Sequence, residues 1–229
     1  MRRIMPYISP RRNESLFYLS TDVDVESALE FVEKRNRERP ADRPMTLFHL
    51  LLRSLSQMFV LRPGINRFVK GGRLWDRNGV YLTFSAKREL VDGAPMLTIK
   101  RRFDPDGETL DEMVDAIYAK LRPARAGVES TSDKETKGLM RLPGFVTWGL
   151  VRAADGLDAL GLLPGFMIEP GPTGRRQMRL FYSYDERVED GLYASIAIGG
   201  NHDRLENPEL LLAPTAELAR LGHGSAQPG

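Results

Sequence analysis

The chain has 229 residues, of which 41% are hydrophobic and 28% are charged, and 33 Lys and Arg balance 31 Asp and Glu to leave a net charge of +2. This composition is that of a globular protein with one large domain or two small ones, and the charge balance provides no overall field for nucleic acid. The absence of cysteine excludes disulfides, thiolate zinc sites and cysteine nucleophiles, and the three histidines have no spacing typical of a metal site.

Neither a membrane span nor a secretory signal is visible. No apolar run reaches the ~18 residues that cross a bilayer. Residues 1–12 carry charges but lack the apolar stretch of a signal peptide. We therefore expect a cytoplasmic protein without a membrane or nucleic-acid partner.

The first half of the chain predicts helices and strands in alternation. Residues 16–21 (LFYLST) are rich in strand formers, and Asp24 then opens a helix with one apolar face. Thr46 can cap a second helix that runs to about Val60, and its apolar residues nearly encircle it, so it should be buried. Gly71-Gly72 is a two-residue turn that predicts a hairpin. The strands expected from this turn onward are 67–70, 73–75, 80–86 and 96–102.

The second half predicts two helices, an alternating strand and a terminal helix. Thr109 and Glu112 form a capping box before one amphipathic helix, and a second amphipathic segment covers 145–160. Strand 177–184 alternates apolar and polar residues. The last helix should begin after Gly191 and end near Pro208, interrupted at Gly199-Gly200 because glycine weakens a helix.

These elements interleave without strict strand–helix–strand repeats. They predict one α/β domain over residues 1–212, with a mixed sheet flanked by helices, and a flexible tail over residues 213–229.

The histidines and the short basic runs each allow a structural and a functional interpretation. His49 lies in the most apolar helix, where a hydrogen-bonded core histidine is more common than a catalytic one. His202 is expected in a kinked helix or turn, and His223 in the solvated tail. The runs 100–102 (KRR) and 175–176 (RR) could bind an anion, although a solvated face is the usual role of such short runs. No serine-nucleophile elbow or phosphate loop occurs.

Residues 185–191 (DERVEDG) place five charges between the alternating strand and the last helix. Such a corner brings backbone N–H groups and carboxylates together and can form a ligand site. The alternative is a polar turn whose carboxylates cap the following helix. Composition alone favours this second interpretation.

This stretch also resembles a known signature. Residues 180–191 read LFYSYDERVEDG, which is similar to the L-x-x-S-Y-D-H-R-x-x-D-G motif of dihydrolipoamide acyltransferase catalytic domains from 2-oxoacid dehydrogenase complexes. Segments 45–66 and 205–211, and the order of elements between them, resemble the same family. The resemblance covers nearly the whole chain, without the lipoyl and subunit-binding domains that precede this domain in the complexes.

The resemblance implies a chloramphenicol acetyltransferase-like fold, that of coenzyme A-dependent acyltransferases. It implies coenzyme A or acyl-CoA as a substrate, no metal, and a homotrimer with the active-site channel between subunits. The site residues carried over from the motif are Glu186, Arg187, Asp190 and Gly191. Among them, Asp190 is expected to pair with an arginine, either Arg3 or Arg187, and to hold the corner in shape.

Two departures from the family pattern bear on activity. Glu186 stands where the family has the histidine that acts as general base on a thiol. With ordinary pKa values, proton transfer from a thiol to imidazole is uphill by about 2 units and to a carboxylate by about 4, a difference of roughly 3 kcal/mol. The family's hydroxyl that stabilises the oxyanion has no match, because segment 165–176 is short and Thr173 is its only hydroxyl.

Two functions therefore stay open. The chain is either a CoA-dependent acyltransferase that moves an acyl group to or from a thiol, or an inactive homologue that serves as a trimeric scaffold or ligand-binding protein.

Overall fold

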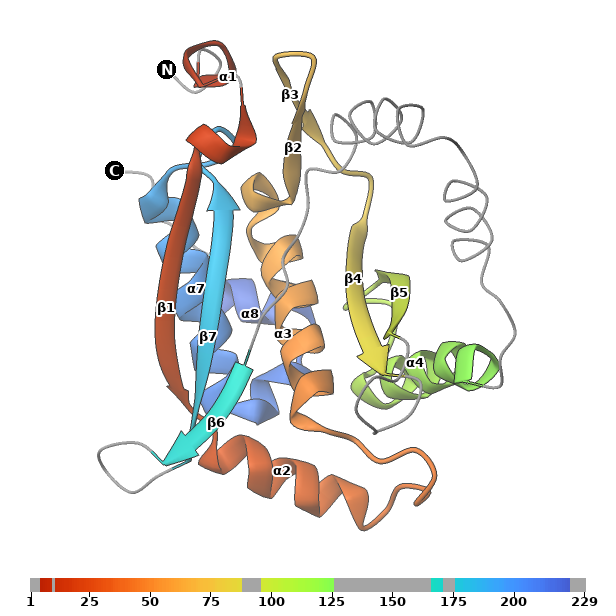
Figure 1. Ribbon diagram of the computed structural model, residues 1–229. Coiled ribbons are helices and arrows are strands. Elements are labelled where there is room, and N and C mark those ends of the chain that lie inside the picture. Colours follow the sequence, from red (N-terminus) through yellow and green to blue (C-terminus); the bar gives the residue numbers. More distant parts are fainter. Residues whose placement is uncertain (1–4, 10, 88–95, 126–165, 171–175, 223–229) are drawn as a thin grey trace.

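The computed structural model describes residues 5–9, 11–87, 96–125, 166–170 and 176–222, and all statements about structure refer to these residues (Figure 1). The predicted segment 145–160 lies outside them, as do Arg3, Thr173, Arg175 and His223. The helices are α1 (Met5–Ile8), α2 (Glu26–Asn36), α3 (Leu47–Leu61), α4 (Leu110–Arg125), α7 (Gly191–Glu206) and α8 (Thr215–Arg220). The strands are β1 (Leu16–Asp24), β2 (Arg67–Lys70), β3 (Arg73–Asp76), β4 (Val80–Lys87), β5 (Met96–Phe103), β6 (Phe166–Pro170) and β7 (Arg176–Asp185).

The described strands form three antiparallel sheets. The largest has the order β1-β7-β6, and β2 pairs with β3 and β4 with β5. The predicted α/β fold of helices and sheets is confirmed, but these strands do not join into one mixed sheet. β1 and β7 pair from Leu16 opposite Asp185 to Asp24 opposite Gln177, so the chain's first long strand lies beside the strand that leads into the signature.

The alternation predicted for β7 is confirmed. Met178, Leu180 and Tyr182 are buried and Phe181 is exposed, because successive side chains of a strand point to opposite faces. The inward side chains belong to the same hydrophobic core as those of helix α3, and α3 lies between this sheet and strand β4 in the view of Figure 1. The predicted burial of α3 follows, since apolar residues cover most of its circumference.

The local turn and cap signals in the sequence are also confirmed. Gly71 and Gly72 have φ of +58° and +70°, the left-handed region required at both central positions of a type I′ hairpin turn. The Thr109 N–H donates to Glu112 Oε2 at 2.7 Å, and the Glu112 N–H donates to Thr109 Oγ1 at 3.2 Å, which completes the capping box of α4.

Two predictions near the C-terminus are wrong. Helix α7 runs without interruption through Gly199 and Gly200, because its buried side chains, among them Ala197 and Leu205, hold it against the core. The burial outweighs the roughly 1 kcal/mol that each glycine costs relative to alanine.

The second concerns the expected tail, since residues 215–220 form α8. Leu218 is fully buried, and the Thr215 N–H and Oγ1 both donate to the Asp106 carboxylate, at 2.7 and 2.5 Å. This segment therefore belongs to the folded domain.

No described helix is long and apolar enough to cross a membrane. In the same part of the chain, no three His, Asp or Glu side chains gather in a way that could hold a metal ion.

Candidate active site at the turn between β7 and α7

The corner that carries the signature is fixed to the start of β1. Strand β7 ends at Asp185 and helix α7 begins at Gly191. The Glu186 N–H donates to the Ser15 carbonyl at 2.9 Å, and the Val188 N–H donates back to the Asp185 carbonyl at 2.9 Å. The backbone of the turn is therefore held both internally and by a neighbouring strand.

A buried ion pair shapes the turn from within. The Arg187 guanidinium is 5% exposed and binds the Asp185 carboxylate in a bidentate manner, with Nε to Oδ1 at 2.8 Å and Nη2 to Oδ2 at 2.5 Å. Asp185 Oδ1 also accepts the Arg187 backbone N–H at 3.0 Å. Arg187 is thus a positioning residue that points into the protein.

The turn also contacts the segment that follows α3. Glu189 is 2% exposed, and its Oε1 lies 3.2 Å from Nη1 of Arg67. A Cβ on Gly64 would come within 2.5 Å of the same Oε1, so a larger residue at this position would require Glu189 to shift. Segment 62–66 (RPGIN) and the signature, far apart in the sequence, therefore form one packed unit.

Asp190 is the N-cap of α7, and its Oδ1 accepts the backbone N–H of Tyr193 at 2.8 Å. The cap role, one of the two roles open from the sequence, is confirmed. Its side chain is exposed. Arg187, one of the two arginines expected to pair with it, binds Asp185, and the other, Arg3, lies outside the described residues, so pairing with Arg3 stays a prediction. As the N-cap, Asp190 folds back over the first turn of α7, which lies at the surface.

Glu186, Tyr184 and Gly191 lie together at the tip of the corner. Glu186 is exposed. A Cβ on Gly191 would lie 3.0 Å from the Tyr184 hydroxyl oxygen and 3.9 Å from Glu186 Oε1, so Gly191 lets both groups approach the start of α7. Within the described part of the chain the Tyr184 hydroxyl is buried without a hydrogen-bond partner. Burial, and secondarily the carboxylates of Glu186 and Asp190, raise the pKa of Tyr184.

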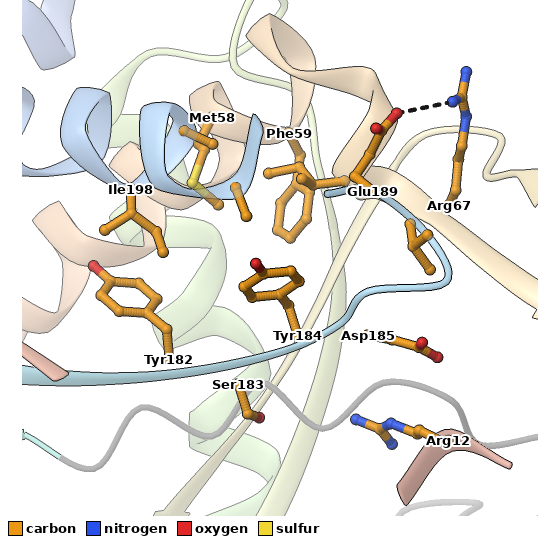
Figure 2. A pocket seen from close by; sticks show the side chains of 14 residues that line it. Arg12, Met58, Phe59, Arg67, Tyr182, Ser183, Tyr184, Asp185, Glu189 and Ile198 are labelled. Atoms are coloured by element: carbon orange, nitrogen blue, oxygen red, sulfur yellow. Dashed lines mark hydrogen bonds and ion pairs between the residues drawn. The ribbon is translucent and has the colours of Figure 1, made fainter. Parts of the chain in front are cut away.

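A pocket of about 80 Å³ lies behind Tyr184, between β7, α3 and α7. Tyr182 and Tyr184 point into it from β7, whereas Ser183 between them points away (Figure 2). Met58, Phe59 and Ile198 form apolar walls, and Arg12, Arg67, Asp185 and Glu189 bring charge to it. Tyr184 thus has one side on an apolar pocket and its hydroxyl beside Glu186.

Sequence analysis assigned the corner and its residues but missed Tyr184. Two signals pointed to it: it is the last residue on the inward face of the alternating strand, and it immediately precedes the charged turn. Tyr184 is a candidate functional residue because its buried hydroxyl lacks a hydrogen bond among the described residues. This property depends on the folded structure and cannot be inferred from the sequence.

The two described histidines lie away from this corner. His49 is 5% exposed, and its Nδ1 accepts the Thr46 N–H at 3.0 Å, so the prediction of a hydrogen-bonded core histidine is confirmed. His49 precedes Met58, a residue that lines the pocket, by nine residues, which is about 13 Å along α3. His49 is therefore too far from the corner to act as its base. His202 lies inside α7, where a kink or turn was expected.

His49 should make stability fall on acidification. Burial, with help from Arg39, lowers its pKa from 6.5 to about 4. Below pH 6.5 the unfolded chain takes up a proton that the folded chain refuses, so the contribution is complete above pH 6.5 and is lost as the pH falls toward 4.

In His49→Gln the glutamine can still accept the Thr46 N–H but does not titrate. Between pH 7 and 5, wild type should lose about 2 kcal/mol more unfolding free energy than His49→Gln in urea titrations. Parallel losses in the two proteins would show that His49 titrates normally.

The basic runs have structural roles where they are described. Arg101 forms a buried ion pair with Glu108, and Arg176 binds Glu26 with Nη2 to Oε1 at 2.6 Å. Both arginines tie their strands to neighbouring segments, which leaves the charged corner as the best candidate site.

No family model and no curated protein matches the sequence. Solved structures match over nearly its whole length. Dihydrolipoamide acetyltransferase from Azotobacter vinelandii superposes with a TM-score of 0.60 at 16% identity, covering 93% of this chain and 92% of that one. The truncated catalytic core of the 2-oxoacid dehydrogenase complex from Thermoplasma acidophilum gives 0.59 at 17% identity, covering 91% and 95%.

A third match, the cubic core of the pyruvate dehydrogenase complex, gives 0.59 at 17% identity and covers 93% and 92%. The chain has the fold of dihydrolipoamide acyltransferase catalytic domains. The fold expected from the signature is thereby confirmed.

Proposed function

We propose that the protein is a coenzyme A-dependent acyltransferase that moves an acyl group to or from a thiol. The observation that carries this proposal is the corner 185–191, which presents an exposed carboxylate at the start of α7 on a rigid, ion-paired turn. The shared fold supports the proposal. The substrate class is inferred from the family resemblance.

Acyl transfer between thiols needs a base, and the proposal assigns this role to Glu186. Its carboxylate takes the proton of the attacking thiol, and the sulfur then bonds to the thioester carbonyl carbon. The tetrahedral intermediate collapses by breaking the original carbon–sulfur bond, and the departing thiolate recovers the proton from Glu186.

The spacing of residues supports this assignment. The Azotobacter vinelandii structure addresses the catalytic roles of a serine, a histidine and an asparagine, of which the last two lie four positions apart. Glu186 and Asp190 have the same spacing here, with a carboxylate in the place that the signature gives to histidine.

An inactive homologue that serves as a scaffold or ligand-binding protein is the second candidate. The observation in its favour is that neither described histidine reaches the corner, while a carboxylate is a weaker base toward a thiol by roughly 3 kcal/mol.

Incubation with several acyl-CoAs and dihydrolipoamide decides between the two. Free CoA is measured by chromatography, because exchange between thiols leaves the total thiol concentration unchanged. An acyltransferase releases CoA from at least one thioester faster than a heat-denatured sample, whereas the inactive homologue releases none above that background.

We also propose that the protein is a homotrimer, and we expect sedimentation at micromolar concentration to give the mass of three 25.8 kDa chains. Large apolar side chains on the outer face of the main sheet, Tyr18 at 71% exposure and Phe181 at 49%, support association. A monomer under these conditions would contradict this proposal and remove the expected channel between subunits.

A further inference from the structure

The geometry points to Tyr184 as the hydrogen-bond donor that stabilises the oxyanion formed during acyl transfer. The inference rests on the proposed function and supplies the hydroxyl for which the sequence offered no match. It identifies a further catalytic residue on the strand itself.

Tyr184 lies at the boundary between the pocket and the charged corner. Tyr184 extends from β7 toward the pocket walls formed by α3 and α7 (Figure 2). Its ring packs against Phe17, with 5.2 Å between ring centroids, and its hydroxyl reaches the first residue of α7. An acyl group whose apolar chain occupied the pocket would have its carbonyl near this hydroxyl and near Glu186.

The Tyr184 hydroxyl also has an unused hydrogen-bonding capacity. Among the described residues the Tyr184 hydroxyl is buried and unpaired, in contrast to the Tyr182 hydroxyl, which accepts a bond from Asn201 Nδ2 at 2.9 Å. Folded proteins pair nearly all buried polar groups, since an unpaired one costs free energy. A ligand oxygen would supply the partner that the described residues do not provide.

The charges around Tyr184 also suit an oxyanion donor. An oxyanion donor must keep its proton, and burial with two neighbouring carboxylates raises the pKa of Tyr184 further above neutrality. The positive end of the α7 dipole begins at Gly191, beside the same hydroxyl. Glu186 becomes neutral when it accepts the thiol proton, which removes its repulsion as the negative charge develops on the substrate oxygen.

The step balances without proton transfer from Tyr184. The thiol proton moves to Glu186, the sulfur bonds to the carbonyl carbon, and the π-electron pair moves to the oxygen, which accepts a hydrogen bond from Tyr184. Collapse returns that pair to the carbonyl and expels the second thiolate, which takes the proton from Glu186.

The test is Tyr184→Phe, which removes only the hydroxyl. Loss of one oxyanion donor should lower kcat by about 10²–10³ with KM within about twofold. The melting temperature should stay the same or rise, because the deleted group has no hydrogen-bond partner among the described residues. Tyr118→Phe is the matched control: it removes a hydroxyl that donates to the Pro44 carbonyl at 2.9 Å, remote from the corner, and should leave kcat unchanged.

A second measurement needs no turnover. The hydrate of a trifluoromethyl ketone analogue of acetyl-CoA mimics the tetrahedral intermediate, and Tyr184→Phe should weaken its binding by about 10–100-fold without changing the affinity for CoA. Equal kcat, or equal analogue binding, in wild type and Tyr184→Phe overturns this inference alone. Absence of analogue binding by wild type overturns it together with the proposed function.

Discussion

Glu186→Gln should lower the rate of acyl transfer by about 10²–10⁴, the usual loss when a general base is removed. The amide keeps the size and most of the hydrogen bonding of the side chain but cannot accept the thiol proton. Because Glu186 is exposed at the tip of a turn held by other residues, folding should be unaffected. The loss should therefore appear in kcat, with an unchanged melting temperature.

The measurement is initial-rate release of CoA from the best acyl-CoA. Glu209→Gln is the matched control, because it removes an equally exposed carboxylate just beyond the opposite end of α7. That variant should turn over as wild type does. Full activity in Glu186→Gln would show that another group accepts the proton, and a loss shared by both variants would point to a nonspecific charge effect.

Asp185→Asn should lower the free energy of unfolding by about 3–5 kcal/mol, the cost of removing one member of a buried ion pair. The side chains of Arg187 and Asp185 are 5% and 11% exposed, and their bidentate contact sets the shape of the turn. The substitution removes the negative charge while preserving the side-chain volume. Activity should fall as well, because Glu186 and Gly191 are carried by the same turn.

The matched control is Asp22→Asn in the exposed pair that Asp22 forms with Arg179, with Nε to Oδ1 at 2.8 Å. Exposed pairs contribute little, since water solvates and screens both charges. Urea unfolding of the two variants should therefore separate clearly. Equal stabilities of Asp185→Asn and Asp22→Asn would mean that the corner is held by its backbone contacts alone.

The elements that sequence analysis predicted correctly are those fixed by local chemistry. Thr46 marks the start of α3, and the apolar circumference of that helix marks its burial. Gly71-Gly72 marks the hairpin, because both residues need positive φ. The alternation in β7 was enough to tell its buried face from its exposed one.

The features that sequence analysis missed are set by contacts between distant segments. Thr215 of α8 is fixed by Asp106, which lies 109 residues earlier, and no local pattern marks that pairing. Glycine in α7 suggested an interruption, but packing against the core keeps the helix intact.

The candidate site also combines features that the local sequence predicts with features that depend on distant contacts. The signature located the corner and named Glu186, Arg187, Asp190 and Gly191. The bonding of Glu189 to Arg67, 122 residues away, and the unpaired hydroxyl of Tyr184 arise only when α3, β7 and α7 meet. The capping bond of Asp190 to Tyr193 is local and could be predicted from its place before α7.

The most direct test of the site is the pH–rate profile of Glu186→His beside that of wild type. If residue 186 is the thiol base, histidine should raise kcat/KM by up to about 150-fold, the equivalent of roughly 3 kcal/mol in proton affinity. The variant's rate should also fall as the pH drops below about 6.5, because imidazole must be neutral to accept a proton. An unchanged rate and an unchanged profile in Glu186→His would contradict acyl transfer at this corner.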